Sequence, residues 1–426
     1  MKTLVGLFAD SSGVSKRRVF YNSAGLIEHV EHCVVAHHRD DEVFNDDCLI
    51  FAGMGDIHIH AREDVSRKHM AKEDFKSCEC AAFNGGLVHV ADMPNNPIPP
   101  VDDTSYKQKL ELSLKRKLHF LMYAGIGPST MPLSFKVPYK VYMGPSIGDL
   151  FFSSNQSLEE RLHFYRHQNV SFHCEDPEIL EQSKNASDHF LRRPLPAENV
   201  ATKFALKLIE KYDLQGKLCH YSSGEGLDLI IDAKKRGVNV SCEVTPQHLF
   251  FSEEKIKSDF PHLQTKFQMN PPIRKESDRQ KLLWALKNGH IDFLATDHAP
   301  HTDDEKIKGT SGLPGLDTYA LFVTWLLNEQ SIDPRIIAKV CCENPGDFSN
   351  QFLDSYRELF PHFKKYGHGF GRIKPGYVAS FSVLNLKKIK TLLPEHIFSK
   401  AKWTPFLNYP FSGSLEALFV MGERTF

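Results

Sequence analysis

The 426-residue chain lacks an excess of charge of either sign, because 52 lysine and arginine residues against 53 aspartate and glutamate residues leave a formal net charge of −1. It therefore has no basic surplus to hold a phosphate backbone, and we expect no nucleic-acid partner. No run approaches the ~18 consecutive apolar residues of a membrane-spanning helix. The N-terminal apolar run is interrupted within a few residues and has no convincing cleavage site, unlike a secretory signal.

The cysteines offer little basis for a disulfide framework. They number nine, are scattered, and include no CxxC pair. This usage favours reduced, buried thiols in a cytoplasmic protein. Hydrophobic residues at 41% and charged residues at 25% are usual for globular domains, which excludes a disordered chain. What the chain has in quantity is histidine, at 22 residues, more than packing alone requires.

Short apolar runs alternate with longer amphipathic stretches from about residue 51 onward. The runs are typical of strands and the stretches of helices. The apolar runs are 51–60, 87–94, 118–125, 139–144, 170–176, 217–223, 238–246 and 291–300, and the main helical stretches are 66–83, 102–117, 157–168, 198–212, 224–236 and 275–288. Eight strands with intervening helices predict an α/β fold, a (β/α)8 TIM barrel, which needs about 250 residues.

The two chain ends are poor in helical patterns and contain runs typical of strands. We predict that residues 1–50 and 365–426 combine into one small β-rich subdomain, and that residues 51–364 form the catalytic barrel. The Gly-rich stretch 367–372 does not follow a strand and open a helix, so it does not indicate a dinucleotide site.

Residues of metal-ligating types gather at the predicted strand ends. His58 and His60 share one face of the first run, because side chains alternate along a strand, so both rings can reach one metal. Taken alone, such a pair of histidines is as often incidental as it is a metal site. His173, His220 and Asp297, however, lie toward the carboxyl ends of the fifth, sixth and eighth runs. In a barrel these ends open onto one face, where we expect a metal centre.

Lys140 stands at the fourth run and has two interpretations. It could be an ordinary strand-end lysine in solvent. If it points into a barrel mouth lined by metal ligands, its ammonium would repel the metals. Carbamylation by CO₂ would instead turn the amine into a carboxylate that can bridge two metal ions.

These residues and motifs together resemble the amidohydrolase superfamily, and within it the cyclic amide hydrolases of the dihydroorotase family. The resemblance covers nearly the whole chain, and the motifs that carry it stand in family order: GDIHIHAR, ADMPNNP, YKVYMG, FHCED, CHYSS, CEVTPQHLFF, MNPPIR, ATDHAPH, SGLPGLDT and GRIKPG. It implies reversible hydrolysis of L-dihydroorotate to N-carbamoyl-L-aspartate. The reverse reaction closes the ring and is a step of de novo pyrimidine biosynthesis. The resemblance therefore implies a cytoplasmic enzyme with a small-molecule substrate, and a homodimer is one option for its assembly.

The resemblance also assigns roles to residues. It implies two Zn²⁺ ions bridged by carbamylated Lys140, with Asp297 acting in addition as general base and acid. The implied metal ligands are His58, His60, Lys140, His173, His220 and Asp297. The implied substrate-binding residues are Arg62, Asn95, Asn270 and His301, of which Arg62 suits a carboxylate because a guanidinium donates two parallel hydrogen bonds.

The chain departs from the family pattern in three places. Arg62 is followed by Glu63-Asp64-Val65 instead of Asp-Pro-Gly, the usual MPNT ends in Asn96, and Ser380 replaces a common acidic residue. Two alternative functions stay open. Another cyclic amidase (a dihydropyrimidinase, hydantoinase or allantoinase) would share the metal site, although the first two do not need the Arg62 clamp. A catalytically silent relative would have lost metal ligands, and here every ligand position is filled.

Overall fold

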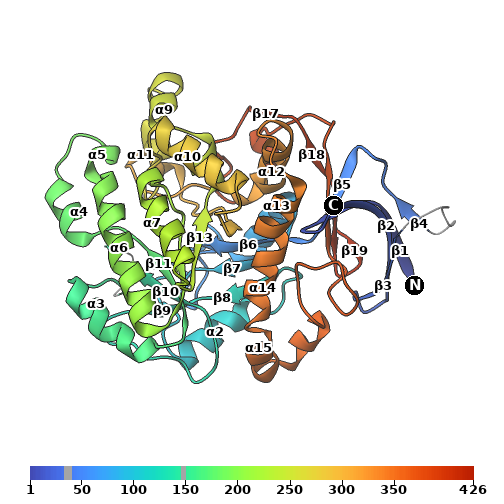
Figure 1. Cartoon of the computed structure of the whole chain (residues 1–426), viewed down its shortest axis with the longest axis horizontal. Coiled ribbons are helices and arrows are strands. Elements are labelled where there is room, and N and C mark those ends of the chain that lie inside the picture. The colour runs from blue at the N-terminus through green and yellow to red at the C-terminus, as the bar shows by residue number, and fades with distance from the viewer. Residues whose placement is uncertain (33–40, 145–149) are drawn as a thin grey trace.

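The computed structural model describes residues 1–32, 41–144 and 150–426, and residues 33–40 of the predicted N-terminal segment lie outside these ranges. A barrel surrounded by helices occupies one side of the molecule, and a β-sheet that contains both chain ends lies on the other (Figure 1). Within the described ranges, no helix combines the length and apolarity needed to cross a membrane.

The barrel consists of parallel strands in two hydrogen-bonded groups, β6–β7–β8 and β9 through β14. Its strands are β6 (Met54–Ile59), β7 (Leu87–Asp92), β8 (His119–Met122), β9 (Ala124–Ile126), β10 (Tyr139–Tyr142), β11 (Asn169–His173), β12 (Gln215–Leu218), β13 (Val240–Val244) and β14 (Phe293–Leu294). Only Tyr123 separates β8 from β9, so these two strands together occupy one position of the barrel. The described residues therefore form eight strand positions. A parallel bridge between Ile59 and His298 joins the first position to the last. The predicted barrel is confirmed.

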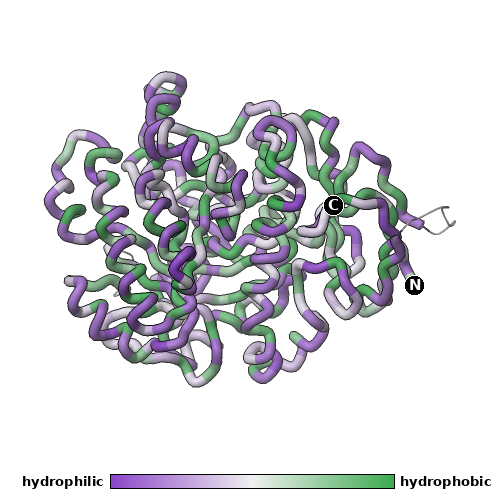
Figure 2. The backbone as a smooth tube through the Cα atoms, in the orientation of Figure 1, coloured by the Kyte–Doolittle hydropathy of each residue, from purple (hydrophilic) through white to green (hydrophobic). Residues whose placement is uncertain are grey.

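Helices connect the strands and cover the outside of the barrel, where hydrophilic and hydrophobic stretches alternate along the chain (Figure 2). The helices are α1 (Phe75–Asn84), α2 (Asp103–Ser113), α3 (Asn155–Leu162), α4 (Pro177–Ser183), α5 (His189–Arg192), α6 (Leu195–Tyr212), α7 (Gly224–Lys235), α8 (Pro246–Phe250), α9 (Glu253–Asp259), α10 (Glu276–Lys287), α11 (Asp303–Ile307), α12 (Tyr319–Asn328), α13 (Pro334–Ala338), α14 (Asn344–Asn350) and α15 (Leu353–Leu359).

Two of these helices show how the sequence sets their limits. The predicted stretch 66–83 is helical only from Phe75, because Asp74 caps that helix by accepting a hydrogen bond from Ser77 N at 2.7 Å. Helix α2 begins in the same way after Asp102. Its Tyr106 and Leu110 face the core at helical spacing, and Lys109 is buried beside them.

The chain ends meet in one mixed sheet with the order β19-β18-β15-β5-β1-β2-β3, in which β4 also pairs with β1. Its strands are β1 (Lys2–Asp10), β2 (Gly13–Tyr21), β3 (Ile27–His32), β4 (Asp41–Val43), β5 (Cys48–Ala52), β15 (Phe381–Asn385), β18 (Ser414–Val420) and β19 (Glu423–Arg424), and β16 (Lys390–Thr391) pairs with β17 (Pro410–Phe411) apart from it.

Gly53 separates this sheet from the barrel, and it is a position of close approach. A Cβ there would lie 2.3 Å from Val88. The predicted run 51–60 therefore spans the end of a sheet strand and a barrel strand. Ser380, the third departure from the family pattern, has a structural place at this junction: its carbonyl accepts from Gly53 N at 2.7 Å and its hydroxyl from Met421 N at 3.0 Å.

Candidate active site at the carboxyl ends of the barrel strands

A cavity of about 390 Å³ opens where the barrel strands end. All ten residues that the sequence singled out line it: His58, His60, Arg62, Asn95, Lys140, His173, His220, Asn270, Asp297 and His301. The wall is completed by Tyr142, Ala299 and the segment 310–312. Parallel strands place residues distant in sequence at one end of a barrel, which is why these side chains converge.

Three ligand atoms converge on one side of the cavity. Asp297 Oδ1 lies 3.0 Å from His60 Nε2 and 3.3 Å from His58 Nε2. On the far side of each ring, Nδ1 faces an oxygen: Glu243 Oε1 at 2.6 Å from His58, and Asn95 Oδ1 at 2.7 Å from His60. A carboxylate or carbonyl oxygen can only accept, so each Nδ1 donates its N–H and each Nε2 keeps its lone pair.

The other side of the cavity holds a second pair of imidazoles. His173 Nδ1 lies 3.0 Å from His220 Nε2. His173 Nε2 donates to Glu175 Oε2 at 2.7 Å, and Arg193 Nε in turn donates to Glu175 at 2.9 Å. The Arg193–Glu175 pair thus fixes the orientation of His173, and the lone pair on Nδ1 points toward His220.

Lys140 lies between these two sides and is completely buried. Its Nζ has no hydrogen-bond partner among the described residues, and it lies 5.3 Å from the centroid of the Tyr142 ring. A buried amine without a partner is costly in a folded protein. The alternative that Lys140 is an ordinary lysine in solvent is therefore wrong.

Burial keeps the imidazoles of the cavity neutral. It lowers the pKa of His58, His60 and His220 well below the ordinary value and lowers that of His173 as well, with the charge of Lys140 adding to the effect. The neutral ring is the form that binds metal ions. Burial also raises the pKa of Asp297 to about 7.

Three site residues have left-handed backbone conformations that side-chain-bearing residues rarely adopt. The φ angles are 63° at Arg62, 36° at His220 and 48° at Asp297. Each such conformation costs on the order of 1–3 kcal/mol and persists only where the surrounding structure holds it. These positions cluster around one cavity, as strained residues do at functional sites.

One group of side chains in the cavity fits a cation. His58 Nε2, His60 Nε2 and Asp297 Oδ1 are three electron-pair donors that face one another, and each ring carries its proton on the opposite nitrogen. Their ligand atoms lie within 4.8 Å of one another. A cation among the three atoms could be bound by all of them, and imidazole nitrogen with carboxylate oxygen suits Zn²⁺.

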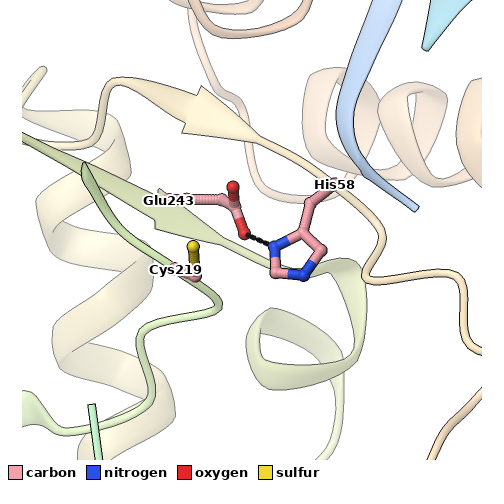
Figure 3. Close-up of side chains that lie close together, drawn as sticks. All are labelled: His58, Cys219 and Glu243. Atoms are coloured by element: carbon pink, nitrogen blue, oxygen red, sulfur yellow. Dashed lines mark hydrogen bonds and ion pairs between the residues drawn. The ribbon is translucent and has the colours of Figure 1, made fainter. Parts of the chain in front are cut away.

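Glu243 belongs to a second group of ligand types within 4.8 Å, together with His58 and Cys219 (Figure 3). Neither Glu243 nor Cys219 lines the cavity. Glu243 instead accepts from His58 Nδ1, from the His220 backbone at 3.0 Å and from buried Lys217. It therefore holds two of the candidate metal ligands, His58 and His220, in place. Sequence analysis missed Glu243, as it missed Glu175. The only signal was a carboxylate inside a strand-like run.

The remaining predicted residues form a second wall of the cavity. Arg62 is 3% exposed, and its Nη2 donates to His301 Nε2 at 3.1 Å. His301 Nδ1 in turn contacts Glu305 at 3.1 Å. Two buried atoms of this wall, Arg62 Nε and Asn270 Oδ1, have no hydrogen-bond partner within the described ranges. A donor and an acceptor thus remain free for a bound molecule.

The departures beside Arg62 and Asn95 are accommodated by hydrogen bonds. Glu63 accepts from Phe75 N at 2.8 Å, at the start of α1. Asp64, 1% exposed, accepts from Ile98 N at 2.8 Å, which ties the Arg62 loop to the loop that follows Asn95. Acidic side chains thus brace these loops against neighbouring backbone groups.

Solved structures with the same fold carry the names of enzymes that act on cyclic amides. An L-hydantoinase (dihydropyrimidinase) from Arthrobacter aurescens superposes with a TM-score of 0.83 at 20% identity, covering 100% of this chain and 96% of that one. A D-hydantoinase (dihydropyrimidinase) from a Thermus species gives 0.79 at 18% identity, covering 99% and 94%. At these identities the likeness establishes the barrel fold.

Curated relatives define the family, although no protein-family model matches the chain. A dihydroorotase of Thermococcus kodakarensis is 31% identical over 382 residues, which are 88% of this chain and 82% of that protein. A dihydroorotase of Shouchella clausii is 28% identical over 447 residues, covering 100% and 98%. The fold and these relatives place the chain among the hydrolases of cyclic amides. Within that class it belongs to the dihydroorotase family.

Proposed function

We propose that the protein interconverts L-dihydroorotate and N-carbamoyl-L-aspartate, the ring-closing reaction of de novo pyrimidine biosynthesis. The observation that carries this proposal is the pairing of two walls in one cavity. One wall gathers four histidines and an aspartate, and the other presents Arg62 with Asn95, Asn270 and His301. A ring amide that also bears a carboxylate matches both walls.

The first wall would hold two Zn²⁺ ions. His58, His60 and Asp297 would bind one, His173 and His220 the other, and Lys140, carbamylated, would supply one oxygen to each. Bound there, the ions would supply a water activated for attack and would polarise the amide carbonyl. A carbamate would also remove the buried, unpartnered ammonium of Lys140 and offset part of the metal charge.

Asp297 would move the proton. In the hydrolytic direction the bond between the ring nitrogen and the carbonyl carbon breaks, the carbon gains the hydroxyl of water, and the nitrogen gains a proton. Asp297 would take that proton from the attacking water and deliver it to the departing nitrogen. In ring closure it would remove the proton from the ureido nitrogen as this nitrogen attacks the β-carboxyl carbon.

Arg62 would bind the carboxylate that distinguishes dihydroorotate from simpler cyclic amides. Its free Nε and its Nη groups lie in one plane, so they can donate two parallel hydrogen bonds. Asn95 and His301 would contribute further contacts to the same carboxylate, and Asn270 would face the edge of the ring. Hydantoins and dihydropyrimidines without a carboxylate would leave this buried guanidinium unpaired, at a cost in affinity.

The test is an assay of the purified, zinc-loaded protein with dihydroorotate, and with dihydrouracil, which has the ring but no carboxylate. We expect N-carbamoyl-L-aspartate from the first. Arg62→Met should weaken the use of dihydroorotate by roughly 10–150-fold, from the loss of about 1.5–3 kcal/mol, and affect dihydrouracil far less. The control is Arg192→Met, because Arg192 donates to Ala186 O and does not line this cavity. Equal losses for both ring compounds would place the clamp elsewhere.

The carbamate has its own test. Lys140→Ala should lower zinc content and activity together, and short carboxylic acids added with zinc should restore part of both. No carboxylic acid would replace a lysine that acts through its positive charge. An unmodified Lys140, seen by mass measurement or crystallography in a fully active enzyme with two metals, would contradict the carbamate.

The proposed setting is the cytoplasm, supported by the eight cysteines of the described residues, all of which are free thiols. A homodimer stays a prediction. It can be tested by measuring the molar mass of the purified protein by size-exclusion chromatography with light scattering over a range of concentrations.

A further inference from the structure

Two neighbouring loops carry the side chains that would bind the substrate carboxylate. Arg62 follows β6, and Asn95 follows β7. Their relative position decides whether both can reach one carboxylate. Arg62 has a strained backbone, with φ at 63°, and Asn95 is shared with the metal side through its 2.7 Å contact with His60. Asp64 joins the two loops beyond these residues through Ile98 N. A second connection joins the segment 92–96 to the backbone just before Arg62.

Lys109, on helix α2, contacts the segment that contains Asn95. It is 2% exposed, and its ammonium group has three partners, two hydrogen-bond acceptors and one carboxylate in an ion pair. Nζ lies 2.8 Å from Asp92 Oδ2 and 3.2 Å from Met93 O, and it donates to Asn96 Oδ1 as well. All three partners lie in residues 92–96, the segment that contains Asn95. One ammonium group thus joins three residues of this segment, through two hydrogen bonds and one ion pair.

Asp92 extends the network to the Arg62 loop. Its second oxygen, Oδ1, accepts from Ala61 N at 2.8 Å, and Ala61 stands between His60 and Arg62 in the chain. One ammonium group therefore fixes the Asn95 segment directly and the backbone before Arg62 through a single carboxylate. Lys109 itself does not line the cavity.

Stability alone does not account for this network. A buried ion pair is weak support for a fold, because desolvation of the two charges offsets most of their attraction, and apolar residues of similar volume often serve as well. What a buried lysine with two hydrogen bonds and an ion pair provides is a fixed geometry. That geometry is placed directly behind the two side chains that would clamp the carboxylate.

We propose that Lys109 is a positioning residue for recognition of the substrate carboxylate, acting through Asn96 and Asp92 on Asn95 and Arg62. The inference rests on the proposed function, since it takes the carboxylate of dihydroorotate as the group that the two loops recognise. Lys109 touches neither substrate nor metal in this scheme. Its loss should therefore raise KM for dihydroorotate and leave kcat nearly unchanged.

The experiment compares three variants of the zinc-loaded enzyme. Lys109→Met should raise KM for dihydroorotate about tenfold and change kcat by less than about threefold, the scale expected when charge-assisted hydrogen bonds that order a binding group are lost. Because Lys109→Met leaves the Asp92 carboxylate buried and unpaired, Lys109→Met/Asp92→Asn removes both charges. Asn96→Ala deletes one acceptor only and should raise KM by about threefold.

The matched control is Lys234→Met. Lys234 also donates from a helix to a carboxylate, that of Asp292, and to a backbone carbonyl, His290 O at 2.9 Å. These acceptors precede β14, whereas the active-site cavity lies at the carboxyl ends of the strands. Lys234→Met should leave KM as in the wild type. A structural role for Lys109 would lower thermal stability and the active fraction without moving KM.

The outcomes separate the two proposals. A wild-type enzyme that turns over dihydroorotate, with unchanged KM in the folded Lys109 variants and in Asn96→Ala, overturns the positioning role and leaves the function intact. If both Lys109 variants fail to fold, KM of Asn96→Ala decides. A wild-type enzyme that binds zinc but does not act on dihydroorotate overturns the proposed function, and the positioning role with it.

Discussion

Two groups of buried histidines lie inside the same barrel and differ in what surrounds them. The cavity histidines are His58, His60, His173 and His220. The base histidines are His89 and His119, which face each other across the β7–β8 pairing, away from the cavity. Burial lowers the pKa of every member of both groups. Burial and a lowered pKa therefore do not distinguish a metal ligand from a core residue.

The difference lies at the ring nitrogens. Three cavity histidines are held at one nitrogen by a carboxylate or amide oxygen, and His220 is placed by its backbone N–H to Glu243. Within the described residues, His119 has no partner at either nitrogen, and the ring of Phe370 stacks on it at 4.9 Å. Of His89, only Nδ1 is bonded, to Ser349 Oγ at 3.1 Å. Oriented lone pairs facing an open cavity mark the candidate metal ligands, whereas aromatic neighbours mark a histidine that packs in the core.

The largest effect should come from the carboxylate that the cavity histidines face. Asp297→Asn keeps an oxygen at the position but cannot take up a proton at neutral pH, so turnover of dihydroorotate should fall by about 10²–10⁴-fold while the fold persists. The control in the other group is Ser349→Ala, which removes the one polar partner of His89 and should leave turnover unchanged. Near-wild-type turnover in Asp297→Asn would remove Asp297 from the proton transfer.

A smaller effect should follow from loosening the hold on His58. Glu243→Gln alone leaves Lys217 buried and unpaired, which costs about 3–5 kcal/mol of unfolding free energy. The double variant Glu243→Gln/Lys217→Met avoids that charge and keeps an oxygen for His58, but without its negative charge. We expect zinc affinity to fall by about 10–100-fold in the double variant, measured by competition with a chelator. Wild-type affinity would mean that the carboxylate behind the ring does not matter, and the contrast between the two groups would fail.

The sequence predicts much of this site because strand position is visible in it. His173, His220 and Asp297 lie toward the carboxyl ends of apolar runs, and in a parallel barrel those ends share one face. His119 opens β8 and His89 lies before the middle of β7, so the same rule assigns neither to the cavity. A count of 22 histidines alone would have included both groups.

The sequence does not show which residues hold the candidate metal ligands in position by hydrogen bonds. Glu243 and Lys217 lie on adjacent strands, and their contact depends on a register, Leu218 opposite Cys242, that only the closed barrel defines. The Lys109 network depends in the same way on how α2 packs against the barrel, where the strand that it contacts is β8. The first predicted helix was too long for a local reason: the segment before Asp74 is a loop that buries Glu73 against His298 and Ser399.

The smallest effect concerns the base histidines and appears in stability at low pH. His119 is buried and neutral, with its pKa well below the ordinary 6.5. Below about pH 6.5 the unfolded chain binds a proton at this ring that the folded protein does not, so the free energy of unfolding falls as the pH decreases. His119→Phe removes this contribution and keeps the aromatic packing. When the pH is lowered from 8 to 5, the free energy of unfolding should fall in both proteins. The fall, measured by urea unfolding, should be smaller in the variant by up to about 2 kcal/mol.

The zinc content of the variant should equal that of the wild type, because we expect no metal contact at His119. Parallel stability curves for the two proteins would show that His119 takes up its proton in the folded state, and reduced zinc content would place it with the cavity histidines.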